Sequence, residues 1–113
     1  MIARSIKPRE ETFIERALHV ALKSTQRYKH GCVLVHRGSV IAESCNYLMT
    51  YRHSVHAEVG AVMRAKKSRV PLAECTLYVV RANSSAECLM SRPCSACEAF
   101  IHSSGIKRVY YSV

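Results

Sequence analysis

Two short stretches of this chain decide its fold and its chemistry, and they read His56-Ala57-Glu58 and Pro93-Cys94-Ser95-Ala96-Cys97. One imidazole nitrogen and two sulfurs, from His56, Cys94 and Cys97, form a ligand set that suits Zn²⁺. Three protein ligands leave one tetrahedral position for water, which is typical of a catalytic metal centre rather than a closed structural one. Glu58 stands two residues from His56, so its carboxylate can reach that water without binding the metal.

The length and composition predict one folded domain, residues 1–113. Apolar residues make up 49% of the chain, which is enough for a packed core. An apolar run of about 18 residues, the length that a membrane span needs, is absent. The net charge is +9, from 17 basic and 8 acidic residues. Such a surface attracts phosphate on a nucleotide or a polynucleotide, although the charge is also explained if it only keeps the protein soluble.

Six cysteines raise the question of disulfides: Cys32, Cys45, Cys75, Cys88, Cys94 and Cys97. Residues 1–7 lack the apolar stretch of a secretory signal. Cys32 and Cys75 lie in or beside apolar runs, where a free cysteine behaves as a small buried hydrophobe. We therefore expect an intracellular, cytoplasmic protein in a reducing environment, with two cysteines on the metal and four free.

The first half of the chain predicts a helix, a hairpin and a second helix. Apolar residues at helical spacing predict a helix over 8–24, with Phe13, Ala17, Val20, Ala21 and Ser24 on its buried stripe. Strands are expected at 32–36 and 39–42 around a turn at 37–38. A polar and aromatic loop is expected at 45–53. It leads to a helix that begins at Ser54 or Val55 and runs to about Lys67. Close approach of this helix to a neighbour would explain Gly60.

The second half alternates strands and helices. A nearly continuous apolar run predicts a central strand at 75–80, covered on both faces. A long connection, 81–92, leads to a helix that begins at Pro93 and stops at Gly105, and a last strand covers 107–111. The crossover rule makes the last two strands parallel. The fold class is therefore α/β, a central mixed sheet of about four to five strands in a two-layer or three-layer arrangement.

The two motifs together are the signature of zinc-dependent nucleobase deaminases. Zinc lowers the pKa of bound water to about 7, which makes hydroxide available at neutral pH. Two thiolates at a helix start are stabilised by free N–H groups and by the helix dipole, which supports Cys94 and Cys97 as ligands. Glu58 is then the proton carrier between the water, a ring nitrogen and the leaving amine.

Other interpretations of the same residues remain open at this point. A closed structural zinc site would need a fourth ligand, for which His53, Cys45 or His102 could be proposed. Cys94 and Cys97 could also form a redox pair. The redox reading explains neither His56 nor Glu58, and the structural site leaves Glu58 without a role.

Most of the chain resembles the cytidine deaminase-like superfamily. The resemblance rests on the two motifs and on three further segments, Asn46, Thr76 to Val80 and Gly105 to Tyr111. It implies a zinc-bound active site, a five-strand sheet in many members and frequent homo-oligomers. Many relatives add a strand and a helix after the last strand seen here. Without them that strand would be an open sheet edge, which favours self-association.

The histidine at position 56 indicates which members of that superfamily the chain resembles most. Free-nucleoside cytidine deaminases typically carry Cys-Ala-Glu, so His56-Ala57-Glu58 looks more like deoxycytidylate, cytosine, guanine and tRNA adenosine deaminases. In several of these an asparagine about ten residues before the histidine contacts substrate, and Asn46 holds that place. A turn residue that ends the hairpin is the alternative role for Asn46.

Three functions follow from these observations. The first is deamination of cytosine to uracil in a nucleotide such as dCMP, with Arg52 and Arg92 near the phosphate. The second is deamination in single-stranded DNA or tRNA, where the aromatic loop would stack the base. The third is a zinc-binding module without activity. We expect a zinc-dependent hydrolase, with Glu58 catalytic, and the expected substrate contacts are Asn46, Tyr51, His53, Ala57 and Arg92.

Overall fold

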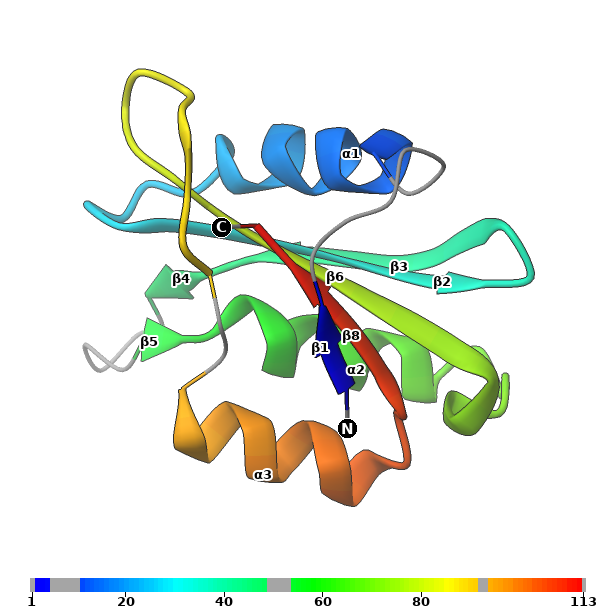
Figure 1. Ribbon diagram of the computed structural model, residues 1–113. Helices are drawn as coiled ribbons and strands as arrows, with labels where there is room; N and C mark the ends of the chain where they lie inside the picture. Colours follow the sequence, from blue (N-terminus) through cyan, green and yellow to red (C-terminus); the bar gives the residue numbers. More distant parts are fainter. Residues whose placement is uncertain (1, 5–10, 49–53, 92–93, 113) are drawn as a thin grey trace.

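The computed structural model describes residues 2–4, 11–48, 54–91 and 94–112 of the chain (Figure 1). The elements follow in the order β1 (Ile2–Arg4), α1 (Glu11–Ala21), β2 (Lys29–His36), β3 (Ser39–Cys45), β4 (Tyr47–Leu48), β5 (Ser54–Val55), α2 (Ala57–Lys66), η2 (Leu72–Glu74), β6 (Cys75–Ala82), β7 (Cys88–Leu89), α3 (Ser95–Ser104) and β8 (Arg108–Tyr111).

The main sheet has the strand order β1-β8-β6-β2-β3, and the short β7 pairs with β6 beside this path. β2 is antiparallel to both β3 and β6, whereas β8 is parallel to β6. The mixed sheet, the hairpin around Arg37 and Gly38 and the parallel final pair confirm the predicted α/β fold. β4 and β5 form a separate two-stranded sheet.

Three layers result because each central strand is apolar on both faces. In β2 the side chains of Cys32 and Leu34 are buried in one cluster with α2 and α3, and those of Val33 and Val35 in another with α1. Alternate residues of a strand point to opposite faces, so one unbroken apolar run supplies both cores. Figure 1 shows α1 on one face of the sheet and α2 and α3 on the other.

Two glycines allow α1 and α2 to come close to the sheet. A Cβ at Gly31 would overlap the Ala17 carbonyl oxygen and the Ala21 backbone, so β2 lies directly against α1 there. A Cβ at Gly60 would overlap the Ser44 hydroxyl, so α2 lies close to β3. The expectation that Gly60 marks a close approach is therefore confirmed.

Several predicted boundaries were wrong because short strands pair within the predicted loops. The predicted 81–92 connection is largely ordered: β6 continues to Ala82 and the chain folds back as β7. The turn between them is held by Asn83, whose Oδ1 accepts the N–H groups of Ser85 and Glu87, each at 3.0 Å. Within the predicted loop at 45–53, Tyr47–Leu48 pairs with Ser54–Val55, so α2 begins only at Ala57.

The two ends of the chain also differ from the prediction. β1 was not predicted, and it pairs in parallel with β8 through three residue pairs, so β8 is not a sheet edge. The first helix is described from Glu11 to Ala21, so the predicted end at Ser24 was wrong by three residues, and the predicted start at 8–10 lies outside the described residues. All six cysteines are free. In the described segments no helix is both long and apolar enough to cross a bilayer.

We predict that Gly31→Ala destabilises the protein by about 2 kcal/mol or more, because the added methyl group overlaps backbone atoms of α1 that cannot rotate away. Urea unfolding followed by circular dichroism measures this change. The control is Gly38→Asn, since a Cβ at Gly38 meets nothing and asparagine tolerates its positive φ of 80°. Equal stability of Gly31→Ala and the wild type would contradict the close packing of α1 on β2.

Candidate active site

The three predicted metal ligands lie at the starts of two helices. His56 is the N-cap residue of α2, and its side chain makes no capping hydrogen bond. Cys94 is the N-cap residue of α3, and its sulfur accepts the Cys97 N–H at 3.5 Å. Both residues have extended backbone, with φ of −70° at His56 and −67° at Cys94, so each side chain leaves its helix axis at the first turn.

The ligand atoms converge on one point. His56 Nδ1 lies 3.0 Å from Cys97 Sγ and 3.9 Å from Cys94 Sγ, and the three atoms lie within 4.8 Å of one another. Cys97 is buried, whereas His56 and Cys94 are open to solvent on one side. One nitrogen and two sulfurs at this spacing fit a tetrahedral Zn²⁺ centre with one position left for another ligand.

Within the described segments no fourth histidine, cysteine or carboxylate joins this group. Cys45 lies in β3 and His102 in the last turn of α3, so neither serves as the fourth ligand of a closed site. His53, the other candidate, lies outside the described residues. The structure also disfavours a redox pair, because His56 Nδ1 contacts the sulfurs of both Cys94 and Cys97.

Glu58 is buried at 4% exposure beside the three ligands. It occupies the first turn of α2, where the helix dipole favours a carboxylate. Burial, followed by the Glu58 charge and the Cys94 thiol, raises the pKa of the Cys97 thiol far above its ordinary value. A bound divalent cation would reverse this effect, because it offsets the repulsion between a carboxylate and two thiolates. The donor set thus fits a cation.

The strand end before α3 is anchored by a pair of serines. The Ser91 hydroxyl donates to the Val79 carbonyl at 2.8 Å, and the Ser91 N–H donates to the Ser112 carbonyl at 2.9 Å. The Ser112 hydroxyl donates to the Leu89 carbonyl at 2.6 Å. These bonds tie Ser91 to β6 and to the residue that follows β8, so one edge of the pocket is joined to the main sheet.

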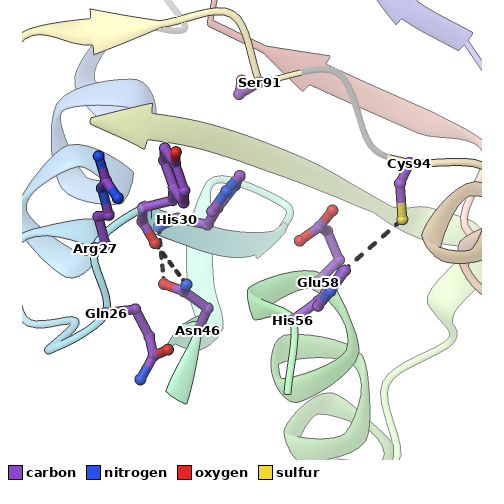
Figure 2. Close-up of a pocket in the computed structure, with 9 residues that line it drawn as sticks. Gln26, Arg27, His30, Asn46, His56, Glu58, Ser91 and Cys94 are labelled. Carbon is purple, nitrogen blue, oxygen red and sulfur yellow. Dashed lines mark hydrogen bonds between the residues drawn. The ribbon is translucent and has the colours of Figure 1, made fainter. Parts of the chain in front are cut away.

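A pocket of about 340 Å³ opens on the ligands and Glu58. Such a volume lies at the small end of the range for small-molecule sites. Figure 2 shows two facing walls: His56, Glu58 and Cys94 on one side, and Gln26, Arg27, His30 and Asn46 on the other. The first wall carries the chemistry, and the second comes from the end of the α1–β2 connection, the start of β2 and the residue after β3.

Asn46 builds the second wall through its side chain. Its Oδ1 accepts the His30 N–H at 2.9 Å, and its Nδ2 donates to the Tyr28 carbonyl at 2.7 Å. The Ser24 hydroxyl donates to the Asn46 carbonyl at 2.9 Å. Asn46 is therefore a backbone clamp as well as a pocket residue, and each end of its amide keeps one hydrogen-bonding position for a ligand.

His30 extends from the second wall toward Glu58 (Figure 2). Burial lowers the pKa of His30 below its ordinary value, the Glu58 charge opposes this, and the charges of Arg81 and His56 add to the lowering. The imidazole is therefore neutral at pH 7, with one nitrogen as donor and the other as acceptor.

The structure brings together His56, Glu58, Cys94, Cys97 and Asn46, as the sequence predicted. Tyr51, His53, Arg92 and Arg52 lie outside the described residues, so their roles stay predictions. The Ala57 side chain is fully buried in the core, which leaves only its main chain to face a ligand.

Sequence reasoning missed the pocket residues Gln26, Arg27, Tyr28 and His30. They belong to one polar and aromatic run, residues 26–30, at the end of the α1–β2 connection and the start of β2. Such a run at the start of a central strand is the signal that would have found them.

An open three-ligand metal centre with a buried carboxylate beside it, set in a three-layer α/β fold, defines the class of zinc-dependent deaminase domains. Residues 7–113 match the family model described as the cytidine and deoxycytidylate deaminase zinc-binding region. The chain belongs to this family.

Known proteins of related sequence and structure agree with this assignment. The chain is 26% identical over 116 residues to a probable cytosine deaminase of Schizosaccharomyces pombe. The alignment covers all of this chain and 65% of that protein. The dCMP deaminase of cyanophage S-TIM5 in its apo form has a TM-score of 0.75 and 26% identity, covering 94% of this chain and 84% of that one. The same enzyme in complex with dCMP and dUMP has a TM-score of 0.70 and 24% identity, covering 94% and 82%.

We predict about one zinc ion per chain in the purified protein, because the His56, Cys94 and Cys97 atoms already converge. His56→Ala and Cys97→Ser should each lower the zinc content sharply, as measured by elemental mass spectrometry after dialysis. Cys88→Ser is the matched control, since Cys88 is an exposed free cysteine on β7. Full zinc content in a His56→Ala, Cys97→Ser double variant would contradict the assignment.

We predict that Asn46→Ala costs about 1–3 kcal/mol of stability, since it leaves the His30 N–H and the Tyr28 carbonyl without their partner. Urea unfolding measures the loss, and hydrogen exchange should be faster at the His30 amide. Asn46→Asp retains the acceptor for that amide and should protect it more than alanine does. Asn83→Ala, which removes a similar amide from an exposed turn, is the control. Unchanged exchange at His30 in Asn46→Ala would rule out the clamp.

Proposed function

We propose that this protein catalyses the hydrolytic deamination of a cytosine ring to uracil in a nucleotide such as dCMP. The observation that carries the proposal is the buried Glu58 carboxylate next to the converging His56, Cys94 and Cys97, all at one end of a nucleotide-sized pocket. Zn²⁺ held by these three residues would act as a Lewis acid and make water nucleophilic near neutral pH.

Glu58 is the group that moves protons. As the oxygen of water bonds to C4 of the ring, the carboxylate accepts a water proton and passes it to the neighbouring ring nitrogen. The second proton then reaches the amino group by the same carboxylate, the C4–N bond breaks, and ammonia leaves. One carboxylate serves both transfers because its helix start holds it beside the ligands, and its burial keeps bulk water from competing.

The second wall of the pocket would hold the ring. Asn46 has one free donor and one free acceptor position, and the neutral His30 offers one of each. Both face Glu58 across the pocket (Figure 2), so a flat base between the walls would have polar partners on its edge. The small pocket favours a single nucleotide over a longer segment of a strand.

Two further observations favour a nucleotide. The chain carries a net charge of +9, which attracts phosphate. The cyanophage dCMP deaminase, which shares the fold, has been solved with dCMP and dUMP. The alternative substrate is cytosine in single-stranded DNA or a base in tRNA, and assembly as a homo-oligomer remains a prediction.

We expect the zinc-loaded protein to convert dCMP to dUMP in a mass-spectrometric assay across cytosine, deoxycytidine, dCMP, guanine, single-stranded DNA and tRNA. Glu58→Gln should lower kcat by about 10²-fold or more, because the proton carrier is lost, and should leave the zinc content unchanged. The matched control is Glu98→Gln in the first turn of α3, which does not line the pocket.

Product from single-stranded DNA or tRNA alone would replace the mononucleotide substrate with a polynucleotide. No product from any substrate with zinc-loaded protein would overturn the enzymatic function. Full activity in Glu58→Gln would remove Glu58 from the mechanism.

A further inference from the structure

We propose that Arg27 and Arg81, both stacked on the ring of Tyr28, bind the phosphate group of the substrate at the mouth of the pocket. The inference rests on the proposed function and names the part of the site that selects a nucleotide over a free base or nucleoside. It assigns the phosphate to the segment between α1 and β2 and to β6, in addition to any role of Arg52 and Arg92.

The three residues meet because β2 and β6 are neighbours. His30 in β2 pairs with Arg81 in β6, so the start of β2 lies beside the end of β6. The guanidinium carbon of Arg81 lies 5.3 Å from the centre of the Tyr28 ring, and that of Arg27 lies 5.6 Å from it. Both distances are within the range of a cation–π contact.

One of these two cations lines the pocket, and the other lies directly behind it on the Tyr28 ring. Arg27 and Tyr28 line it directly, and Figure 2 shows Arg27 on the wall that faces Glu58, His56 and Cys94. The positive charge of Arg81 also acts on His30 inside the pocket, where it contributes to the lowered pKa. A bound nucleotide with its base at Glu58 would thus have its phosphate directed toward the arginines.

Neither guanidinium has a carboxylate partner among the described residues. The ion pairs found there use other cations: Arg16 with Glu43, and His36 and Arg37 with Glu74. Two guanidinium groups that share one ring place two positive charges near each other, and a bound anion would offset their repulsion. A phosphate, which accepts several N–H groups at once from planar arginine forks, is the anion that this geometry suits.

Tyr28 is the positioning residue of this group. Tyr28 is 56% exposed, Arg27 is exposed and Arg81 is half-buried, and both guanidinium groups rest on the Tyr28 ring. The Tyr28 carbonyl accepts a hydrogen bond from Asn46, which holds the backbone that carries the ring. Holding two long side chains in place beforehand reduces the entropy lost on binding.

The test compares a ligand with and without the phosphate. Isothermal calorimetry on the zinc-loaded protein measures the Kd of dUMP and of deoxyuridine, and steady-state assays measure kcat/KM for dCMP and deoxycytidine. Arg27→Gln and Arg81→Gln should each weaken dUMP binding about 10- to 100-fold, the range of a charge-assisted hydrogen bond. Deoxyuridine binding should change less than about twofold.

Arg108→Gln is the matched control for charge. Arg108 is exposed in β8 and pairs with Thr76, five positions before Arg81 in β6, which places it about 16 Å away along the sheet. The substitution removes the same charge without touching the pocket. At 0.15 M salt the Debye length is about 8 Å, so about two Debye lengths separate Arg108 from the site and dUMP binding should be unchanged. Tyr28→Phe should bind dUMP as the wild type does, whereas Tyr28→Leu should bind it more weakly.

The outcomes separate this inference from the proposed function. Equal loss of dUMP and deoxyuridine binding in the arginine variants, or no loss of either, would overturn the phosphate site while leaving deamination intact. An oligodeoxycytidylate whose binding alone depends on Arg27 and Arg81 would overturn the mononucleotide assignment and make its backbone the phosphate source. Absence of turnover in the wild type would instead contradict the proposed function itself.

Discussion

The site depends on one constraint, the meeting of the first turns of α2 and α3 on the same face of the sheet. A histidine at the start of one helix and two cysteines at the start of the other then point at one another, with His56 Nδ1 3.0 Å from Cys97 Sγ. Each helix is set by its own contacts: Gly60 lets α2 approach β3, and Ile101 of α3 is buried in one core cluster with side chains of β6 and β8. A shift of either helix along the sheet would separate the ligand atoms and move Glu58 away from them.

The opposite wall of the pocket depends on a different set of bonds. Asn46 follows β3 and reaches across to the backbone of Tyr28 and His30 at the start of β2. The wall is therefore held by hydrogen bonds, whereas the ligand wall is held by helix packing. This difference between the two walls has a chemical consequence. The reaction needs a fixed metal and carboxylate, whereas recognition of the substrate can change with the residues that Asn46 holds on the second wall.

Much of the architecture could be read from local patterns. The helical stripe of Ala17, Val20 and Ala21 is buried as predicted, and Gly105 ends α3 in the left-handed conformation, with φ of 96°. The errors arose where very short strands pair. β1, β7 and the β4–β5 pair are each two or three residues long, and so short a strand has no periodicity of its own to detect. Each exists only through its partner strand, and the partner of β1, β8, lies at the other end of the chain.

The sequence by itself predicted the three residues that converge, the carboxylate beside them and the central strands that are buried on both faces, because residue type and spacing along a helix start or a strand set those features. Only the tertiary structure decided that α1 covers the face opposite α2 and α3, that Asn46 clamps the wall, and that Arg27 and Arg81 share the ring of Tyr28. These contacts join residues far apart in the chain, such as His30 and Arg81 in neighbouring strands. Such proximity follows from sheet register, which a single sequence leaves open until its strands are paired.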